Sequence, residues 1–260
     1  MQFSASASLR PYVKGYTVIT VDQDIINEVF YPSGYVDFAV NISGGSAITI
    51  INGRSIDMPN VEVLGHLTMP TRLTVARGMS VLIARIYPYA TQLFFPNPVS
   101  DFTNNSIDLS DIRKDDSNQF YEQLMQGRTI EEKVMALDDF LLDRLKQNEK
   151  LLTKANFLAQ MCNRICAEGD AFDIRRLAEN YGFSERYIQK LFNNVVGLSP
   201  REFFTVQRFN KSLELIRTSQ AQLTSIAYDC GYYDQAHFIK EFRKFTGITP
   251  SEARPSLSVG

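Results

Sequence analysis

A group of polar side chains in the C-terminal third of the chain has the spacing and the chemistry to read nucleic-acid bases. Glu185, Arg186, Gln189 and Lys190 recur three and four residues apart, so on a helix they share one face. Arg and Lys can donate hydrogen bonds to guanine O6 and N7, and Gln can pair with the adenine edge. These residues predict base contacts in a major groove, with a solvated helix face as the alternative.

A second group follows about fifty residues later and repeats this arrangement. We expect its first member to cap a helix rather than read a base, because Asp is a preferred N-cap residue. Three further basic residues are better placed for phosphates, which position a protein without reading sequence. The second group comprises Asp234, Gln235, His237 and Lys240, and the expected phosphate contacts are Arg201, Arg243 and Lys244.

The elements that must position both groups form one pattern that occurs twice. Each copy has a short helix with Ala on its buried face, then a glycine (Gly182 or Gly231) where a tight turn requires a positive φ angle. A second helix with apolar residues at three- and four-residue spacing follows, and Gly197 or Gly247 is placed to end it. Two helix-turn-helix units are therefore predicted, over about 174–194 and 223–246.

New helices are predicted directly after each unit. Ser199-Pro200-x-Glu202 and Thr249-Pro250-x-Glu252 each combine a hydroxyl N-cap, a proline at the first helical position and a glutamate three residues after the cap. The first of these helices should run to about Thr218 and connect the two units.

With these motifs the last ninety or so residues resemble the DNA-binding domain of the AraC/XylS family of bacterial transcription regulators. The stretch from Gly231 to Pro250 carries most of the resemblance, and Ser212 departs from the small apolar residue usual in the connecting helix. The resemblance implies two helix-turn-helix units joined by a long helix, promoter DNA and RNA polymerase as partners, and an N-terminal domain that senses a ligand.

Composition and charge fit a protein of at least two domains. The 260 residues carry a formal charge of −2, but residues 172–260 hold 12 Lys+Arg against 9 Asp+Glu and are net basic. A basic end on an acidic remainder favours phosphate contact by that end alone. Three cysteines, no apolar leader and no membrane-length apolar run predict a cytoplasmic protein without structural disulfides.

The N-terminal part has the pattern of short strands. Val36 to Ile42 alternates apolar and polar residues, and Asn52-Gly53 between two apolar runs is a strong hairpin signal. Further strands are expected at Val61–Leu64, Leu73–Ala76 and Val81–Tyr87. A small β-barrel or sandwich is predicted over residues 1–116, and the family resemblance implies that it is cupin-like.

Helical periodicity replaces this pattern after Ser117. Ile130 to Leu145 and Leu151 to Met161 form two apolar stripes, which could pack on the β domain or form a dimer interface, with about equal weight on helix-packing grounds. Ala167–Ala171 is the expected linker. The fold class is therefore α+β, with a sensor domain at 1–116, connecting or dimerisation helices at 117–170 and the DNA-binding domain at 171–260.

Three N-terminal residues are candidates for contact with a small ligand: Arg85, His66 and Tyr35. If the strand face that Arg85 shares with Val81 and Ile83 points inward, the guanidinium needs a carboxylate partner or an anionic ligand. The aromatic residues around Tyr35 line ligand pockets in some proteins but fill ordinary cores more often.

An enzyme is a poor reading of this sequence. Only two histidines occur, Ser43-Gly44-Gly45-Ser46 is better explained as a turn, and Cys162 and Cys166 as buried reduced thiols than as a metal site. No cofactor and no metal is expected. The sequence predicts a DNA-binding transcription regulator whose N-terminal domain senses a small ligand or partner. The alternative is a regulator whose N-terminal domain only dimerises or docks a protein.

Overall fold

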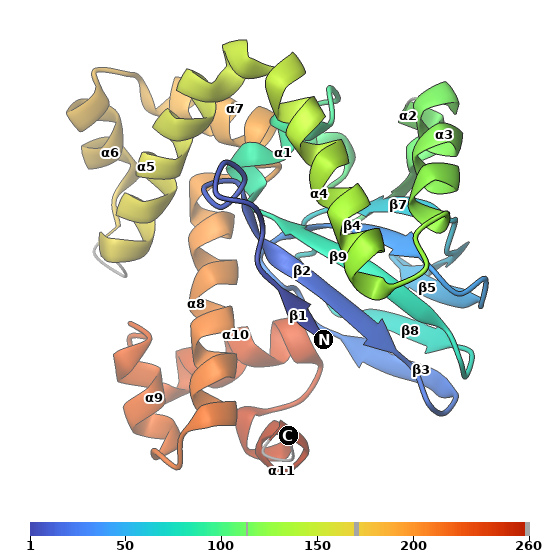
Figure 1. Ribbon diagram of the computed structural model, residues 1–260. Coiled ribbons are helices and arrows are strands. Elements are labelled where there is room, and N and C mark those ends of the chain that lie inside the picture. Colours follow the sequence, from blue (N-terminus) through green and yellow to red (C-terminus); the bar gives the residue numbers. More distant parts are fainter. Residues whose placement is uncertain (113, 169–171, 258–260) are drawn as a thin grey trace.

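The computed structural model describes residues 1–112, 114–168 and 172–257. It has the expected α+β composition, with antiparallel sheets in the N-terminal half and helices in the C-terminal half (Figure 1). The expected linker Ala167–Ala171 lies mostly outside the described residues, as does the expected boundary between residues 170 and 171.

Two antiparallel sheets make up the N-terminal half. The six-stranded sheet has the order β1-β2-β9-β4-β7-β10 and the four-stranded sheet the order β3-β8-β5-β6, so they form an open sandwich and not a closed barrel. The strands are β1 Gln2–Phe3, β2 Val13–Thr20, β3 Ile25–Phe30, β4 Val36–Asn41, β5 Ala47–Ile51, β6 Arg54–Asp57, β7 Val61–Leu64, β8 Thr71–Val75, β9 Ser80–Ile86 and β10 Ser106–Asp108.

The predicted hairpin joins β5 to β6. Asn52 and Gly53 adopt φ angles of 53° and 73°, as a two-residue hairpin turn with both central residues left-handed requires. No individual strand was predicted before Val36, although β1, β2 and β3 lie there. In β2 the register shifts between Val13 and Gly15, which interrupts the period-two pattern on which the prediction depends.

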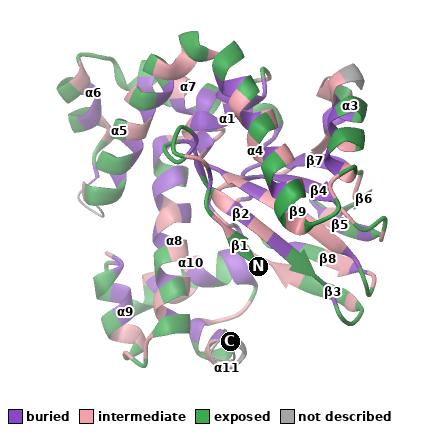
Figure 2. Ribbon diagram, viewed as in Figure 1, coloured by how far each residue is buried: buried purple, intermediate pink, exposed green. Residues whose placement is uncertain are grey.

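The main N-terminal core lies on one face of the six-stranded sheet. Strand β4 is buried along its whole length, and Phe38 at its centre is fully inaccessible (Figure 2). The Phe38 ring lies 5.1 Å from the Phe95 ring and 5.7 Å from the Phe140 ring, between centroids. The opposite face looks toward the four-stranded sheet, where the buried apolar cluster is much smaller: Val21, Ala47, Val75 and Met79.

Helices cover the well-packed face. They are α1 Thr91–Phe94, α2 Leu109–Ile112, α3 Lys114–Met125, α4 Ile130–Gln147 and α5 Leu152–Glu168. The predicted stripe on α4 belongs to the same core as Phe38, so this helix packs on its own sheet (Figure 1). Helix α5 is shared: Ala155 belongs to the N-terminal core, whereas Leu158 and the apolar residues after it belong to the C-terminal core.

The C-terminal half is helical. Its helices are α6 Ile174–Tyr181, α7 Glu185–Val195, α8 Pro200–Thr218, α9 Leu223–Asp229, α10 Gln235–Thr246 and α11 Pro250–Leu257. The long helix α8 runs through the middle of this half, with α6 and α7 near one end and α9 to α11 near the other (Figure 1). Phe203, Val206 and Phe209 of this helix are buried, and so is Ser212, whose hydroxyl donates a hydrogen bond to the Phe209 carbonyl (2.7 Å).

Candidate DNA-binding surface and neighbouring cavities

Local sequence signals build the first unit, α6–α7. The Asp173 carboxylate accepts a hydrogen bond from the Arg175 N–H and caps α6, and the Ser184 hydroxyl accepts one from the Tyr187 N–H and caps α7. Between them Gly182 has φ 69°, and its N–H donates to the Ala178 and Glu179 carbonyls. The turn therefore has the left-handed residue that the sequence predicted.

Helix α7 separates its apolar and polar residues onto different faces. Ile188 and Phe192 are fully buried, whereas the four predicted base-reading residues are exposed. Glu185 lies 3.6 Å from the Arg175 guanidinium in an ion pair that is open to solvent. The side chains left available to a DNA groove are Arg186, Gln189 and Lys190.

The second unit, α9–α10, has the same construction. Asp234 caps α10, as expected, because its Oδ1 accepts a 2.7 Å hydrogen bond from the His237 N–H. Gln235 and Lys240 are exposed on this helix, and so are Arg243 and Lys244 in its last turn. Helix α10 ends at Gly247, with φ 80°. This end of the domain thus presents a row of cations that can approach phosphates.

A buried arginine fixes α10 against α8. Arg208 is 3 % exposed and forms a bidentate pair with Glu241, at 3.0 Å for Nε–Oε1 and 2.6 Å for Nη2–Oε2. Its guanidinium also lies over the Tyr232 ring, 4.3 Å from the centroid. The imidazole of His237 lies 3.4 Å from Arg208 Nη2, which directs it toward this network, so His237 is a weaker candidate for base contact than its sequence position indicates.

The length of α8 sets the distance between the units. Its 19 residues span about 28 Å at the rise of an α-helix. Successive major-groove turns on one face of B-DNA are about 34 Å apart. Units near the two ends of this helix are therefore at a separation comparable to one DNA turn.

Two exposed tyrosines extend the candidate surface beyond the residues found from sequence. Tyr187 on α7 is 47 % exposed and packs against Phe183 with the rings tilted by 32° and their centroids 4.6 Å apart. Tyr233, beside the cap of α10, is 84 % exposed. Neither tyrosine was among the residues predicted to contact DNA. The signal that could have found these two is their position next to the N-caps of the presumed recognition helices.

The N-terminal half makes hydrogen bonds to the C-terminal end of α7. The Thr103 hydroxyl donates a 2.7 Å hydrogen bond to the Gly197 carbonyl, and Gln92 Nε2 donates a 3.3 Å bond to the Asn194 carbonyl. Both acceptors lie at or beyond the C-terminal end of the helix, whereas Arg186 and Lys190 stay exposed. The polar face is thus not covered by other parts of the described chain.

Comparison with known proteins agrees with this geometry. Residues 177–256 match a family model described as a helix-turn-helix domain, and residues 1–108 match a domain of unknown function, DUF6597. An uncharacterized HTH-type transcriptional regulator of Haemophilus influenzae is 34 % identical over 86 residues, covering 33 % of this chain and 29 % of the relative. The transcriptional activator RhaS of Escherichia coli is 33 % identical over 78 residues, covering 30 % and 28 %.

The C-terminal domain of this chain is an AraC/XylS-type helix-turn-helix domain.

The aligned part spans under a third of these curated relatives. Both relatives are named as regulators of transcription, which agrees with the expectation that the chain is not an enzyme. The structure of ToxT from Vibrio cholerae matches over 94 % of this chain and 98 % of its own, with a TM-score of 0.50 and 14 % identity. That likeness shows a shared fold, in which a helical C-terminal domain follows an N-terminal β domain.

Two of the three ligand candidates lie where this β domain meets the AraC/XylS-type domain. Tyr35 and Arg85 line a cleft of about 550 Å³ against Lys211 and Arg217 of α8. Arg85 lies opposite Asp37 in the sheet register, with its Nε 3.8 Å from Asp37 Oδ1, so the carboxylate partner expected for an inward-facing Arg85 is present.

His66 is separate from this cleft. It is fully buried in the segment after β7, where burial lowers the pKa of its imidazole to about 4. The residue is therefore neutral at physiological pH, and the structure does not bring it together with Arg85 and Tyr35.

A second cavity, of about 120 Å³, lies between the two sheets. Val81 and Ile83 line it, so the face that they share with Arg85 does point toward the sandwich interior. Most of the residues that line it are aliphatic. Asp37 and Glu62 are the charged residues among them. Both are about 95 % buried. Burial raises the pKa of Asp37 to about 6, although the charge of Arg85 lowers it in part. Burial also raises the pKa of Glu62, although the hydrogen bond from Ser106 acts in the opposite direction.

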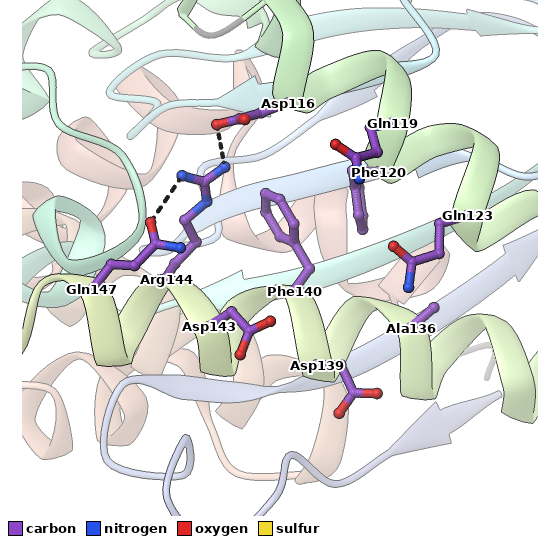
Figure 3. Close-up of a pocket in the computed structure, with 10 residues that line it drawn as sticks. All are labelled: Asp116, Gln119, Phe120, Gln123, Ala136, Asp139, Phe140, Asp143, Arg144 and Gln147. Carbon is purple, nitrogen blue, oxygen red and sulfur yellow. Dashed lines mark hydrogen bonds and ion pairs between the residues drawn. The ribbon is translucent and has the colours of Figure 1, made fainter.

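A groove between α3 and α4, of about 270 Å³, has different chemistry (Figure 3). Its buried arginine, Arg144, already pairs with Asp116 at 2.6 Å and reaches Gln147 at 3.4 Å. The remaining carboxylates, Asp139 and Asp143, are exposed. The groove is therefore an acidic surface whose central cation is satisfied within the chain.

The cysteines differ from their expected state in one respect. Cys162 is buried, and burial raises the pKa of its thiol well above the ordinary value. Cys166, one turn later, is exposed rather than buried. The spacing of four residues placed both thiols on one helix face, but that face of α5 is only partly covered.

Proposed function

We propose that this chain is a transcription regulator that binds promoter DNA through both helix-turn-helix units. The observation that carries the proposal is the polar face of α7, where Arg186, Gln189 and Lys190 are exposed opposite a fully buried apolar face. A basic set on α10 accompanies it at the other end of α8. In this arrangement one protomer occupies two adjacent major-groove segments, so its site is asymmetric and needs no second copy.

Different parts of this surface have different roles. Arg186, Gln189 and Lys190 on α7, with Gln235 and Lys240 on α10, contact base edges. Arg201, Arg243 and Lys244 contact phosphates and set the orientation. Glu185, Asp234 and His237 shape the surface through the ion pair, the cap and the Arg208 network in which they take part.

The N-terminal domain responds to a small ligand or partner and changes the position of the first unit. The hydrogen bonds from Thr103 and Gln92 support this proposal, because they connect the β domain directly to the end of α7. The cleft at Arg85 and Tyr35 lies on the same junction and adjoins α8. Contact with RNA polymerase and association into dimers are also part of the proposal. Their support is the family resemblance alone.

The alternative role, in which the N-terminal domain only dimerises or docks a protein, predicts a different interior for the sandwich. A dry, filled interior favours docking, whereas a cavity that contains polar groups favours ligand sensing. The Asp37 and Glu62 carboxyls in the cavity between the sheets favour sensing.

The test is a double substitution, Arg186→Ala with Lys190→Ala, compared with Lys14→Ala with Arg54→Ala. Both pairs remove two exposed cations, but the control pair lies on the N-terminal sheets. Selection of binding sites from random DNA gives a preferred site for the wild-type chain. The α7 variant should lose discrimination at that site by about 10- to 100-fold per base contact, while the control keeps it.

Footprinting adds a second measurement. One wild-type protomer should protect two adjacent groove segments. Unchanged site preference in the α7 variant, or protection of a single segment, would contradict the proposed mode of binding.

A further inference from the structure

The cavity between the two sheets contains a buried acid with an unmet hydrogen bond. Asp37 is 5 % exposed, and its Oδ1 accepts no hydrogen bond from the described residues. It forms a long ion pair with Arg85, whose Nε lies 3.8 Å away and likewise makes no hydrogen bond in the described chain. A buried charge without hydrogen bonds is costly, so the site favours an additional donor.

A second carboxyl group lies on the same wall. In the β4–β7 register Asp37 pairs with Leu64 and Ala39 with Glu62, so the two acids are diagonal neighbours on one face of the sheet. Diagonal neighbours of this kind are roughly 7–8 Å apart at Cα, close enough for one small group to lie between the side chains. Ser106 donates a hydrogen bond to Glu62 Oε2 at 2.5 Å, which fixes this carboxyl group at the edge of the cavity.

The charge balance of the cavity is negative. Two carboxyl groups line it, whereas the Arg85 guanidinium is 38 % exposed and faces the cleft at α8 as well. An anionic ligand would meet repulsion from both acids, and a neutral one would leave their charge uncompensated. An ammonium group offers three donors and one positive charge in a compact volume.

The other residues that line the cavity favour a ligand whose remaining part is apolar. Ile83, Leu73, Val75 and Met79 belong to it, and Ile19 at its margin is 43 % exposed, which leaves a way in between the sheets. A cavity of about 120 Å³ is slightly smaller than the roughly 150 Å³ apolar cavity known to accept benzene. One ring or a short branched chain therefore fills it.

We propose that this cavity binds a small primary amine, with its ammonium group between Asp37 and Glu62 and its apolar part between the sheets. The proposal deepens the effector response and depends on the proposed function for its biological role. The ligand class follows from the buried acids and the size of the cavity.

The experiment is calorimetry on the full chain with three probes of one ring size: benzylamine, benzyl alcohol and benzoate. Benzylamine should bind at least tenfold tighter than the other two. Equal or tighter binding of benzyl alcohol or benzoate overturns the proposal, and so does the absence of heat from all three. This ranking is measured on the wild-type chain and needs no variant.

Three variants locate the site. Asp37→Asn and Glu62→Gln should each weaken benzylamine binding at least fivefold, with benzyl alcohol binding unchanged. Asp57→Asn is the matched control, because it removes an exposed carboxylate from β6 and should leave benzylamine binding as it is. If Asp37→Asn does not fold by circular dichroism, Glu62→Gln carries the test. Unchanged benzylamine binding in every folded variant of the pair overturns the site.

The same preparations separate this proposal from the proposed function. Fluorescence anisotropy with the selected DNA site reports on the AraC/XylS-type domain alone. Amine binding without DNA binding refutes the regulator and keeps the cavity assignment. DNA binding without any preference for the amine refutes the cavity assignment and keeps the regulator.

Discussion

Replacing Asp37 with Asn should stabilise the protein at alkaline pH and not at acid pH. Burial raises the pKa of this carboxyl from an ordinary 3.8 to about 6. The folded state therefore holds the proton more tightly than the unfolded state between these two values. For this reason the contribution of Asp37 to the free energy of unfolding falls as the pH rises through that window.

The size of the effect follows from the shift. Each pKa unit corresponds to about 1.4 kcal/mol, so ionised Asp37 costs the folded state about 3 kcal/mol at pH 8. Asn has nearly the same shape and cannot ionise. About 1 kcal/mol of this cost is already present at pH 4.5, because the unfolded state is ionised there. The difference in unfolding free energy between Asp37→Asn and the wild type should thus grow by about 2 kcal/mol from pH 4.5 to pH 8. Arg85 loses its partner in the variant, but its side chain is partly exposed and can be hydrated.

Urea unfolding followed by tyrosine fluorescence is a suitable assay, because the chain has 12 tyrosines and no tryptophan. Measurement at pH 4.5, 6 and 8 gives the growth of the difference, in which groups common to both proteins cancel. Glu62 adds to the effect in the same direction, since the charge of Asp37 contributes to its raised pKa. The reasoning would be refuted if the variant were less stable than the wild type and this deficit in unfolding free energy were larger at pH 8 than at pH 4.5.

Three further perturbations have defined outcomes. Arg208→Met leaves Glu241 without its bidentate partner and should cost about 3–5 kcal/mol in urea unfolding, whereas Arg217→Met on the exposed side of α8 should change stability by less than about 0.5 kcal/mol. Gly182→Ala meets no neighbouring atom but must keep φ 69°, so it should cost about 1–2 kcal/mol, and Gly182→Asn less; equal costs would show that φ is not the cause. Burial lowers the pKa of the His66 imidazole to about 4, so below pH 6.5 the unfolded state binds the proton first and the wild type loses stability. His66→Gln should remove this loss; an unfolding free energy that falls as steeply with acidification as in the wild type would count against this.

The C-terminal domain could be predicted in detail because its signals are local. A cap such as Ser184, a turn residue such as Gly182 and a capping box such as Ser199 with Glu202 each determine the backbone within a few residues. Gly182 and the capping box of Ser199 with Glu202 occur in the structure at the predicted positions, whereas the Ser184 cap was not predicted. Separation of Arg186 from the buried Ile188 required only the helical period.

The N-terminal domain was predictable only in part, because its important contacts are long-range. Strands β4 to β9 coincide with the apolar runs found in the sequence, whereas β10 was not predicted. The pairing of Asp37 with Arg85 depends on β4 lying beside β9. Neither Asp37 nor Glu62 was a candidate, since a polar residue within a strand usually indicates a solvent-facing position. Their burial results from a second sheet folding over that face, which no local pattern specifies.

The shared helix α5 determines how this protein can be divided. Leu158, Met161 and Ile165 belong to the same apolar cluster as α6, α7 and α8, although they precede residue 172. A fragment that starts at residue 172 would lose these side chains and leave apolar surface on the remaining helices in water. Anyone who isolates the C-terminal module, or grafts it onto another sensor, should therefore cut ahead of Leu152 and carry the whole helix along.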